Sequence, residues 1–265
     1  MSRPEQLESY IKFCQYRQES NKFERINFEN TTDLNATTIL PLYNFILDNP
    51  KIEYVLPSNK MFANCISEIF KKNVDDSCNK SAPIISIPID EKRSNDAFQN
   101  IFRLVQYGPT CGGEQSFKYI IGELLDNIYQ HSSFKRASVM IETYSNKGYV
   151  ELCILDNGIT IPESFRKSNI IYYHQQHSMA IADAVNGLSS KAGSGRGYGL
   201  WSTMKLLSEG LDSQIFLISG LGAIFISRDR RIRYDLTDEL RCYGTLISVR
   251  IPYPSPIIDI YNYID

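Results

Sequence analysis

Three polar residues recur at every fourth position in residues 113–131, a segment whose apolar residues are spaced as in a helix. They are Glu123, Asn127 and His131. At about 100° per residue, their side chains lie within roughly 80° of one another, in one polar stripe beside an apolar one. A carboxylate, an amide and an imidazole in such a stripe form either a solvated helix face or one wall of a functional site.

A further acidic residue, Asp156, ends the apolar run VELCIL and is followed by Asn157-Gly158. A carboxylate that is buried at the end of a strand can accept a hydrogen bond from an exocyclic amine. Gly158 would let a flat ring lie close to the backbone. The alternative is a plain Asp-Asn-Gly turn.

Glycines stand at alternate positions of residues 193–199 in the stretch AGSGRGYGLW, where a helical pattern begins. Glycine lets the backbone approach a ligand closely, and a helix start directs free N–H groups at a phosphate. No Lys-Ser/Thr pair follows the last glycine, and no strand precedes the loop, so it is neither a P-loop nor a dinucleotide-binding fingerprint. A flexible surface loop is the other interpretation.

The first 83 residues are expected to form a small α/β domain. Helices are predicted at residues 4–18, 33–49 and 58–73, and strands at residues 23–28 and 51–57. Asp33 is the expected cap of the second helix, and Pro41 is expected to end or kink its first part. Residues 73–83 are polar and rich in turn residues, as is typical of a linker or long loop.

Residues 84–265 are expected to form a second domain, in which helices precede most of the strands. Helices are predicted at residues 95–106, 113–131, 174–188 and 200–210, and strands at 84–89, 137–145, 148–156, 213–220, 222–229, 231–236 and 244–252. Residues 161–192 form a longer and less regular stretch, which contains the helix predicted at residues 174–188. This order predicts an α+β fold, with a helix layer against a mixed, mostly antiparallel sheet.

Taken together, the motifs resemble those of the GHKL ATPase superfamily, which includes DNA gyrase, MutL, histidine kinases and the serine-kinase anti-sigma factors. The motifs are an E-x-x-D-N-x-x-x-H helix, D-N-G, a G-x-G-x-G loop that opens a helix, and a Gly-Thr strand, in that order. The resemblance covers residues 96–252. It implies a Bergerat-type ATP-binding α/β sandwich, with ATP and Mg²⁺ as cofactors.

Four residues take specific roles from this resemblance. Glu123 matches the glutamate that activates water for attack on the γ-phosphate, and Asn127 matches the asparagine that coordinates Mg²⁺. These roles fit phosphoryl transfer, which depends on charge neutralisation and an oriented nucleophile. Asp156 matches the aspartate that binds the adenine amino group. Gly158 matches the first glycine of a D-x-G-x-G box, whose second glycine is replaced here by Thr160.

The other residues that the resemblance places near the nucleotide are Lys191, Gly195, Arg196, Gly197, Gly199 and Thr245. The three glycines match a loop that wraps the phosphates, and the threonine matches a residue near the adenine. The two cations flank the loop and are within reach of the terminal phosphates. Residues 160–194 correspond to the ATP lid of the family. For Lys191 and Arg196 the alternative is a solvated cation, and for Thr245 it is an ordinary strand residue.

Composition excludes several classes of partner. A formal net charge of −2 gives no whole-chain electrostatic basis for binding nucleic acid. Six scattered cysteines without a C-x-x-C pair predict reduced thiols in a cytoplasmic protein. No apolar run approaches the ~18 residues that a membrane helix needs, so no membrane partner is expected.

Residues 25–72 resemble a STAS-type domain in the order of their elements: strand, helix, strand ending in proline, helix. Three functions remain open. The first is an ATPase whose nucleotide state controls a lid and a protein partner or self-association. The second is a serine/threonine protein kinase of the anti-sigma type. The third is an ATP-gated regulatory binding module without hydrolysis. Glu123 followed by Asp126-Asn127 favours the ATPase, and the STAS-like part favours the other two.

Overall fold

The computed structural model describes residues 3–71, 84–93, 95, 98–101, 111–171, 176–190 and 198–263. The chain divides into two compact units, Met1–Ile84 and Ile85–Asp265. Within the described residues, no helix has both the length and the hydropathy that crossing a bilayer requires.

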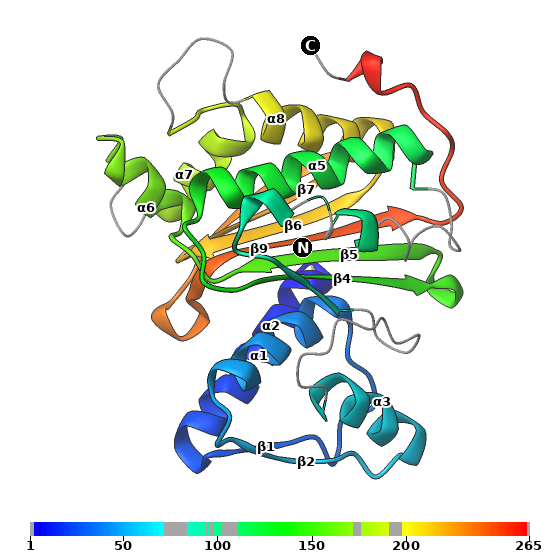
Figure 1. Ribbon diagram of the computed structural model, residues 1–265, viewed down its shortest axis with the longest axis vertical. Helices are drawn as coiled ribbons and strands as arrows, with labels where there is room; N and C mark the ends of the chain where they lie inside the picture. Colours follow the sequence, from blue (N-terminus) through cyan, green and yellow to red (C-terminus); the bar gives the residue numbers. More distant parts are fainter. Residues whose placement is uncertain are drawn as a thin grey trace. The chain divides into compact units, whose positions relative to one another are not determined.

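Helices and strands alternate in the first unit, in the order that the sequence predicts (Figure 1). The elements are α1 (Glu5–Phe23), β1 (Arg25–Asn27), α2 (Ala36–Asp48), β2 (Glu53–Val55) and α3 (Lys60–Lys71). The two strands pair in parallel, with Ile26 opposite Tyr54. Because a helix connects two parallel neighbours, β1, α2 and β2 form one βαβ unit.

Helix α2 differs from the prediction at two points. Its N-cap is Asn35, whose side chain accepts a hydrogen bond from the Thr38 N–H, and not Asp33. Pro41 lies inside the helix without ending it. A proline removes one hydrogen bond of the helix, whereas apolar residues on both sides of it, such as Leu40 and Leu42, are fully buried and hold α2 in place.

The second unit contains a seven-stranded sheet, whose strands lie in the order β3-β4-β5-β9-β6-β7-β8. The strands are β3 (Ile84–Ile87), β4 (Ala137–Tyr144), β5 (Tyr149–Asp156), β6 (Gln214–Gly220), β7 (Gly222–Ser227), β8 (Arg230–Asp235) and β9 (Cys242–Pro252). Every pairing from β4 to β8 is antiparallel. The turn at Asn146-Lys147-Gly148 joins β4 to β5 as predicted, with Gly148 in the left-handed region.

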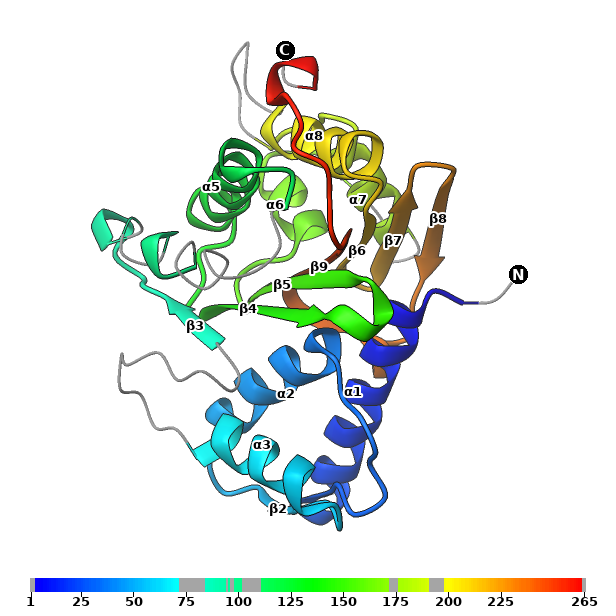
Figure 2. The ribbon, with the colours of Figure 1, turned by 90° about the vertical axis from the view of Figure 1, so that its right-hand side faces the viewer.

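One face of this sheet is covered by helices (Figure 2). They are α5 (Glu114–His131), α6 (Ile161–Lys167), α7 (His177–Val185) and α8 (Tyr198–Lys205), which continues as a π-helical turn, Leu206–Gly210. The predicted fold class, a helix layer on a mostly antiparallel sheet, is confirmed.

The pleat of β5 determines which of its side chains meet the helices. Val150, Leu152 and Ile154 alternate along the strand and pack in one core with the apolar stripe of α5, including Leu124 and Ile128. Asp156 is the next residue in this alternation, so it lies on the helix-covered face at the strand end. Strand periodicity thus places a carboxylate beneath α5.

Residues 161–171 and 176–190 contain more regular structure than the sequence analysis predicted. They contain the unpredicted helix α6, whose N-cap is Thr160, with its side chain accepting from the Glu163 N–H at 3.3 Å. Thr160 has a φ of −74°, which explains why no second glycine is needed there. Helix α7 buries Ile181 and Val185 in the main core, so it belongs to the body of the domain.

Candidate functional site

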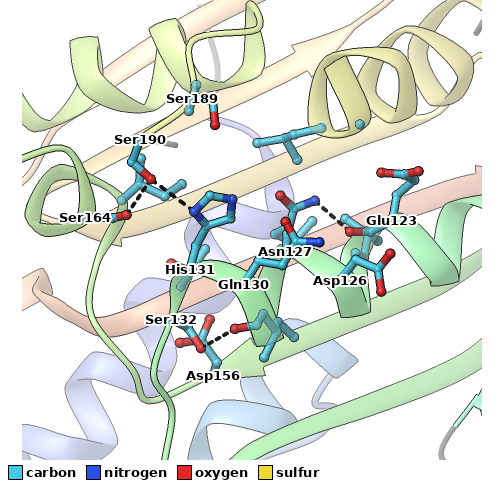
Figure 3. A pocket seen from close by; sticks show the side chains of 18 of the residues that line it. Glu123, Asp126, Asn127, Gln130, His131, Ser132, Asp156, Ser164, Ser189 and Ser190 are labelled. Atoms are coloured by element: carbon cyan, nitrogen blue, oxygen red, sulfur yellow. Dashed lines mark hydrogen bonds between the residues drawn. The ribbon is translucent and has the colours of Figure 1, made fainter. Parts of the chain in front are cut away.

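A pocket of about 430 Å³ opens between α5, α6, the start of α8 and the ends of the central strands (Figure 3). Residues singled out in the sequence line it, among them Glu123, Asn127, His131, Asp156, Gly199 and Thr245. Four others, Lys191, Gly195, Arg196 and Gly197, lie outside the described residues. The polar stripe of α5 therefore lies along a wall of this pocket.

Asp156 forms part of the buried end of the pocket. Its side chain is only 3% exposed and accepts hydrogen bonds from the backbone N–H groups of Gly158, at 2.8 Å, and Thr245. Burial raises the pKa of the carboxyl from 3.8 to about 7, although these two hydrogen bonds oppose the rise. Among the described residues no cation forms an ion pair with it. The site therefore contains a strong acceptor with lone pairs that remain available to a donor.

Gly158 is required by a contact within the protein. A Cβ placed on it would overlap the backbone carbonyl of Ser132, the C-cap of α5. The next residue, Ile159, donates its N–H to the same carbonyl at 2.6 Å. The sequence interpretation of Gly158, a close approach of a flat ring, is thus not needed to explain this glycine, because the loop after β5 crosses the end of α5 here.

We expect Gly158→Ala to destabilise the unliganded protein by about 1–3 kcal/mol, because the added methyl group overpacks the crossing. Gly122→Ala is the matched control: a Cβ at Gly122, inside α5, meets nothing within 4 Å. This control should be neutral or stabilise by about 0.5–1 kcal/mol, since alanine is the better helix former. Urea unfolding monitored by circular dichroism measures both variants. Equal stabilities would contradict the packing explanation.

Glu123 and Asn127 are oriented by the helix that carries them. The Asn127 side-chain N–H donates to the Glu123 carbonyl at 2.6 Å, which leaves the amide oxygen at the other end of the group as an acceptor. Glu123 is half-buried. Its burial, and then the nearby Asp126 carboxylate, raise its pKa above the ordinary range. An amide oxygen and a carboxylate with raised proton affinity therefore share one wall.

The first turn of α8 contacts Glu123. A Cβ on Gly199 would overlap the Oε2 atom of Glu123, so glycine is what allows this carboxylate to lie against the helix start. Tyr119 and Ser202 join the same two helices through their hydroxyl groups at 2.7 Å. A helix N-terminus attracts negative charge. The carboxylate thus lies where an anionic ligand would also be stabilised.

Sequence reasoning missed a polar chain at the other end of α5. His131 Nδ1 lies 3.0 Å from Ser190 Oγ, which accepts a hydrogen bond from Ser164 Oγ at 2.9 Å (Figure 3). His131 thus lines the pocket and contacts a pair of serines, of which Ser164 belongs to α6. Ser164 and Ser190 lie in the stretch judged irregular, where no periodicity marks a site residue.

The sequence also contains an H-x-x-H pair, His174 and His177. His174 lies outside the described residues. His177 Nδ1 accepts the Leu221 N–H at 2.9 Å and so attaches α7 to the turn between β6 and β7. Within the described residues, no three His, Cys, Asp or Glu side chains come together as metal ligands.

Comparison with known proteins identifies the domain. Residues 112–254, more than half of the chain, match the family model described as histidine kinase-, DNA gyrase B-, and HSP90-like ATPase. Searches of curated proteins and of solved structures find no match. The matched range contains α5, the end of β5, the start of α8 and β9, which together surround the pocket. The chain therefore belongs to the histidine kinase-, DNA gyrase B- and HSP90-like ATPase family, and its second unit is a GHKL-type ATP-binding domain.

Proposed function

We propose that the pocket binds Mg-ATP and that the chain hydrolyses it, with the nucleotide state controlling a lid and a protein partner. The observation that carries this proposal is the arrangement on α5. A carboxylate with raised proton affinity and an amide oxygen share one pocket wall, and a buried acceptor lies at the pocket's inner end.

The residues at both ends of the pocket have the chemistry that a bound nucleotide needs. Asp156 would accept a hydrogen bond from the adenine amino group, since its carboxylate is buried beside apolar residues such as Ile154 and Ile247. Asn127 would contribute a ligand to Mg²⁺ through its amide oxygen, and the bound ion would neutralise charge on the phosphates. Thr245 lies beside Asp156 and would face the base.

Glu123 would act as the general base. Its carboxylate would orient a water molecule and accept its proton, and its raised pKa strengthens it as a proton acceptor. Gly199 provides the space that this carboxylate needs at the start of α8. By family resemblance, the phosphates would bind at the same helix start, together with Lys191, Gly195, Arg196 and Gly197.

We infer a lid that is shorter than residues 160–194. Ile161, the first residue of α6, donates its N–H to Ser219 of β6 at 2.9 Å, and α7 is part of the core. Both helices are thus attached to the sheet. The candidate lid is therefore the part of this range that follows α7.

Mg-ATP is expected to slow tryptic cleavage after Lys191 and Arg196, because bound phosphates would engage the segment that contains them. Cleavage after Lys147, which is exposed in the turn between β4 and β5, serves as the internal control and should not change. Mass spectrometry of timed digests measures all three sites. Equal rates at Lys191 and Arg196 with and without nucleotide would contradict the lid.

A protein partner, or a second copy of the chain, would respond to the nucleotide state. The first unit, with its STAS-like order of elements, is our candidate for the partner-binding part. Four described cysteines, Cys14, Cys111, Cys153 and Cys242, are buried and form no disulfide, which supports a reducing, cytoplasmic location.

One experiment separates the proposed ATPase from its alternatives. The purified chain is incubated with γ-labelled ATP and Mg²⁺, alone and with candidate partners. Label released as free phosphate supports hydrolysis. Label on a protein would replace this proposal with a protein kinase, and nucleotide that binds but stays intact would replace it with an ATP-gated binding module.

A further inference from the structure

We propose that Ser219, a buried residue of β6, determines base specificity by fixing the direction of the Thr245 hydroxyl hydrogen. Thr245 then presents only a hydrogen-bond acceptor to the pocket. This inference rests on the proposed function, because it assumes that the pocket end beside Asp156 and Thr245 holds the purine.

Three polar residues lie side by side across the central strands. Asp156 of β5 is directly opposite Thr245 of β9, and Thr245 is directly opposite Ser219 of β6. Directly opposed residues project on the same face of a sheet. Asp156 and Thr245 line the pocket, whereas Ser219 is fully buried and supports Thr245 from the side away from Asp156.

The hydrogen bonds of Ser219 determine which hydroxyl donates. A serine hydroxyl has one hydrogen and two lone pairs. Ser219 Oγ donates to the carbonyl of Gly244 at 3.0 Å and accepts the N–H of Ile161 at 2.9 Å. Its third contact is Thr245 Oγ1 at 2.9 Å. Both contacts can be hydrogen bonds at once only if the single Ser219 hydrogen is directed to Gly244, which can only accept, and the Thr245 hydroxyl donates to Ser219.

The backbone donors at this end of the pocket are also occupied. The Gly158 N–H donates to the Asp156 carboxylate at 2.8 Å, and the Thr245 N–H also stabilises its charged form. Thr245 therefore retains only hydroxyl lone pairs for a ligand, and Asp156, when ionised, likewise only accepts. Two neighbouring acceptors favour a purine edge that donates at position 6, such as an amine. They disfavour one that presents an oxygen, because facing acceptors remain unsatisfied.

The test uses two triphosphates of nearly equal size, N6-methyl-ATP and 6-methoxypurine riboside triphosphate. They differ at position 6, where one carries an N–H donor and the other an oxygen acceptor. Calorimetry gives the ratio of their Kd values for each variant. We expect the wild-type protein to bind the methylamino ligand at least tenfold more tightly, and Ser219→Ala to reduce this ratio by about tenfold, the effect of roughly one hydrogen bond.

The ratio of the two Kd values separates recognition of the base from binding of the ribose and the phosphates. Ser219→Ala also removes the acceptor of the Ile161 N–H, but any resulting change in α6 affects both ligands alike, since they share ribose and phosphates. Thr245→Ser should retain the wild-type ratio. In a Thr245→Val background, Ser219→Ala should cause no further change in the ratio, as a double-mutant cycle requires if Ser219 acts through Thr245.

Two results would overturn the inference: an unchanged ratio in folded Ser219→Ala, or an equal change in the Thr245→Val background. If Ser219→Ala does not fold, Ser219→Cys has a similar volume and a weaker donor and acceptor, and it should shift the ratio in the same direction. An unchanged ratio in Ser219→Cys would overturn the inference as well. Failure of the wild-type protein to bind ATP would instead refute the proposed function.

Discussion

Glu123→Gln is expected to lower ATP turnover by about 10²–10⁴-fold, the contribution of a positioned general base, while ATP still binds. Glutamine preserves the size and polarity of the side chain but cannot accept a proton from water. The carboxylate has the position for this role, because it lines the pocket against the start of α8. It also has a pKa raised by burial and by Asp126. Phosphate release measures turnover, and calorimetry measures ATP affinity.

Two further substitutions on α5 make the result specific. Glu114→Gln is the matched control, because Glu114 is an exposed glutamate whose carboxylate pairs with Lys118, and its turnover should remain at the wild-type level. Asn127→Ala should behave differently, since losing the amide oxygen should weaken Mg-ATP binding itself. Wild-type turnover in Glu123→Gln would show that Glu123 is not the base.

Asp156→Asn is expected to weaken ATP binding by about tenfold or more. The amide would present a donor where the adenine amine needs an acceptor. A lost hydrogen bond to a buried charged group corresponds to about 1.5–3 kcal/mol. Calorimetry on the folded variant checks this prediction, and unchanged affinity would refute the role of Asp156 in binding the base.

The same substitution should stabilise the unliganded protein above pH 7. Because the pKa of Asp156 rises from 3.8 to about 7 on folding, the folded state holds a proton that the unfolded chain releases between about pH 4 and pH 7. The free energy of unfolding therefore falls as the pH rises through this window and is lowest above it. The shift corresponds to roughly 4 kcal/mol of destabilisation that asparagine would remove.

Thermal unfolding at pH 5 and pH 8 tests the sign. The Tm of Asp156→Asn should exceed that of the wild type at pH 8 and lie close to it at pH 5, where Asp156 is protonated in the folded protein. Asp212→Asn is a matched control at an exposed position with positive φ, which asparagine tolerates, and it should change little at either pH. A Tm gain of Asp156→Asn over the wild type that is larger at pH 5 than at pH 8 would contradict the assigned cause.

Helix α5 and strand β5 could be predicted from sequence because their signals are local. The apolar stripe of α5 has the helical period, and the alternating residues of β5 lead directly to Asp156. The order of the three motifs was also sufficient for the ATPase family, which the match over residues 112–254 confirms. Periodicity and motif order do not depend on where distant segments lie.

Two features of the site could be found only in the tertiary structure. Ser219 becomes Thr245's partner through the register of β6 and β9, and sequence alone does not specify which residues of two strands are opposed. Gly158 is explained by the crossing of two chain segments at Ser132. The sequence itself determined the side chains, their helical or strand period and hence the family. The pairing of strands and the packing of α5 and α8 decided the rest, because hydrogen bonds and steric contacts between distant residues arise only once the chain has folded.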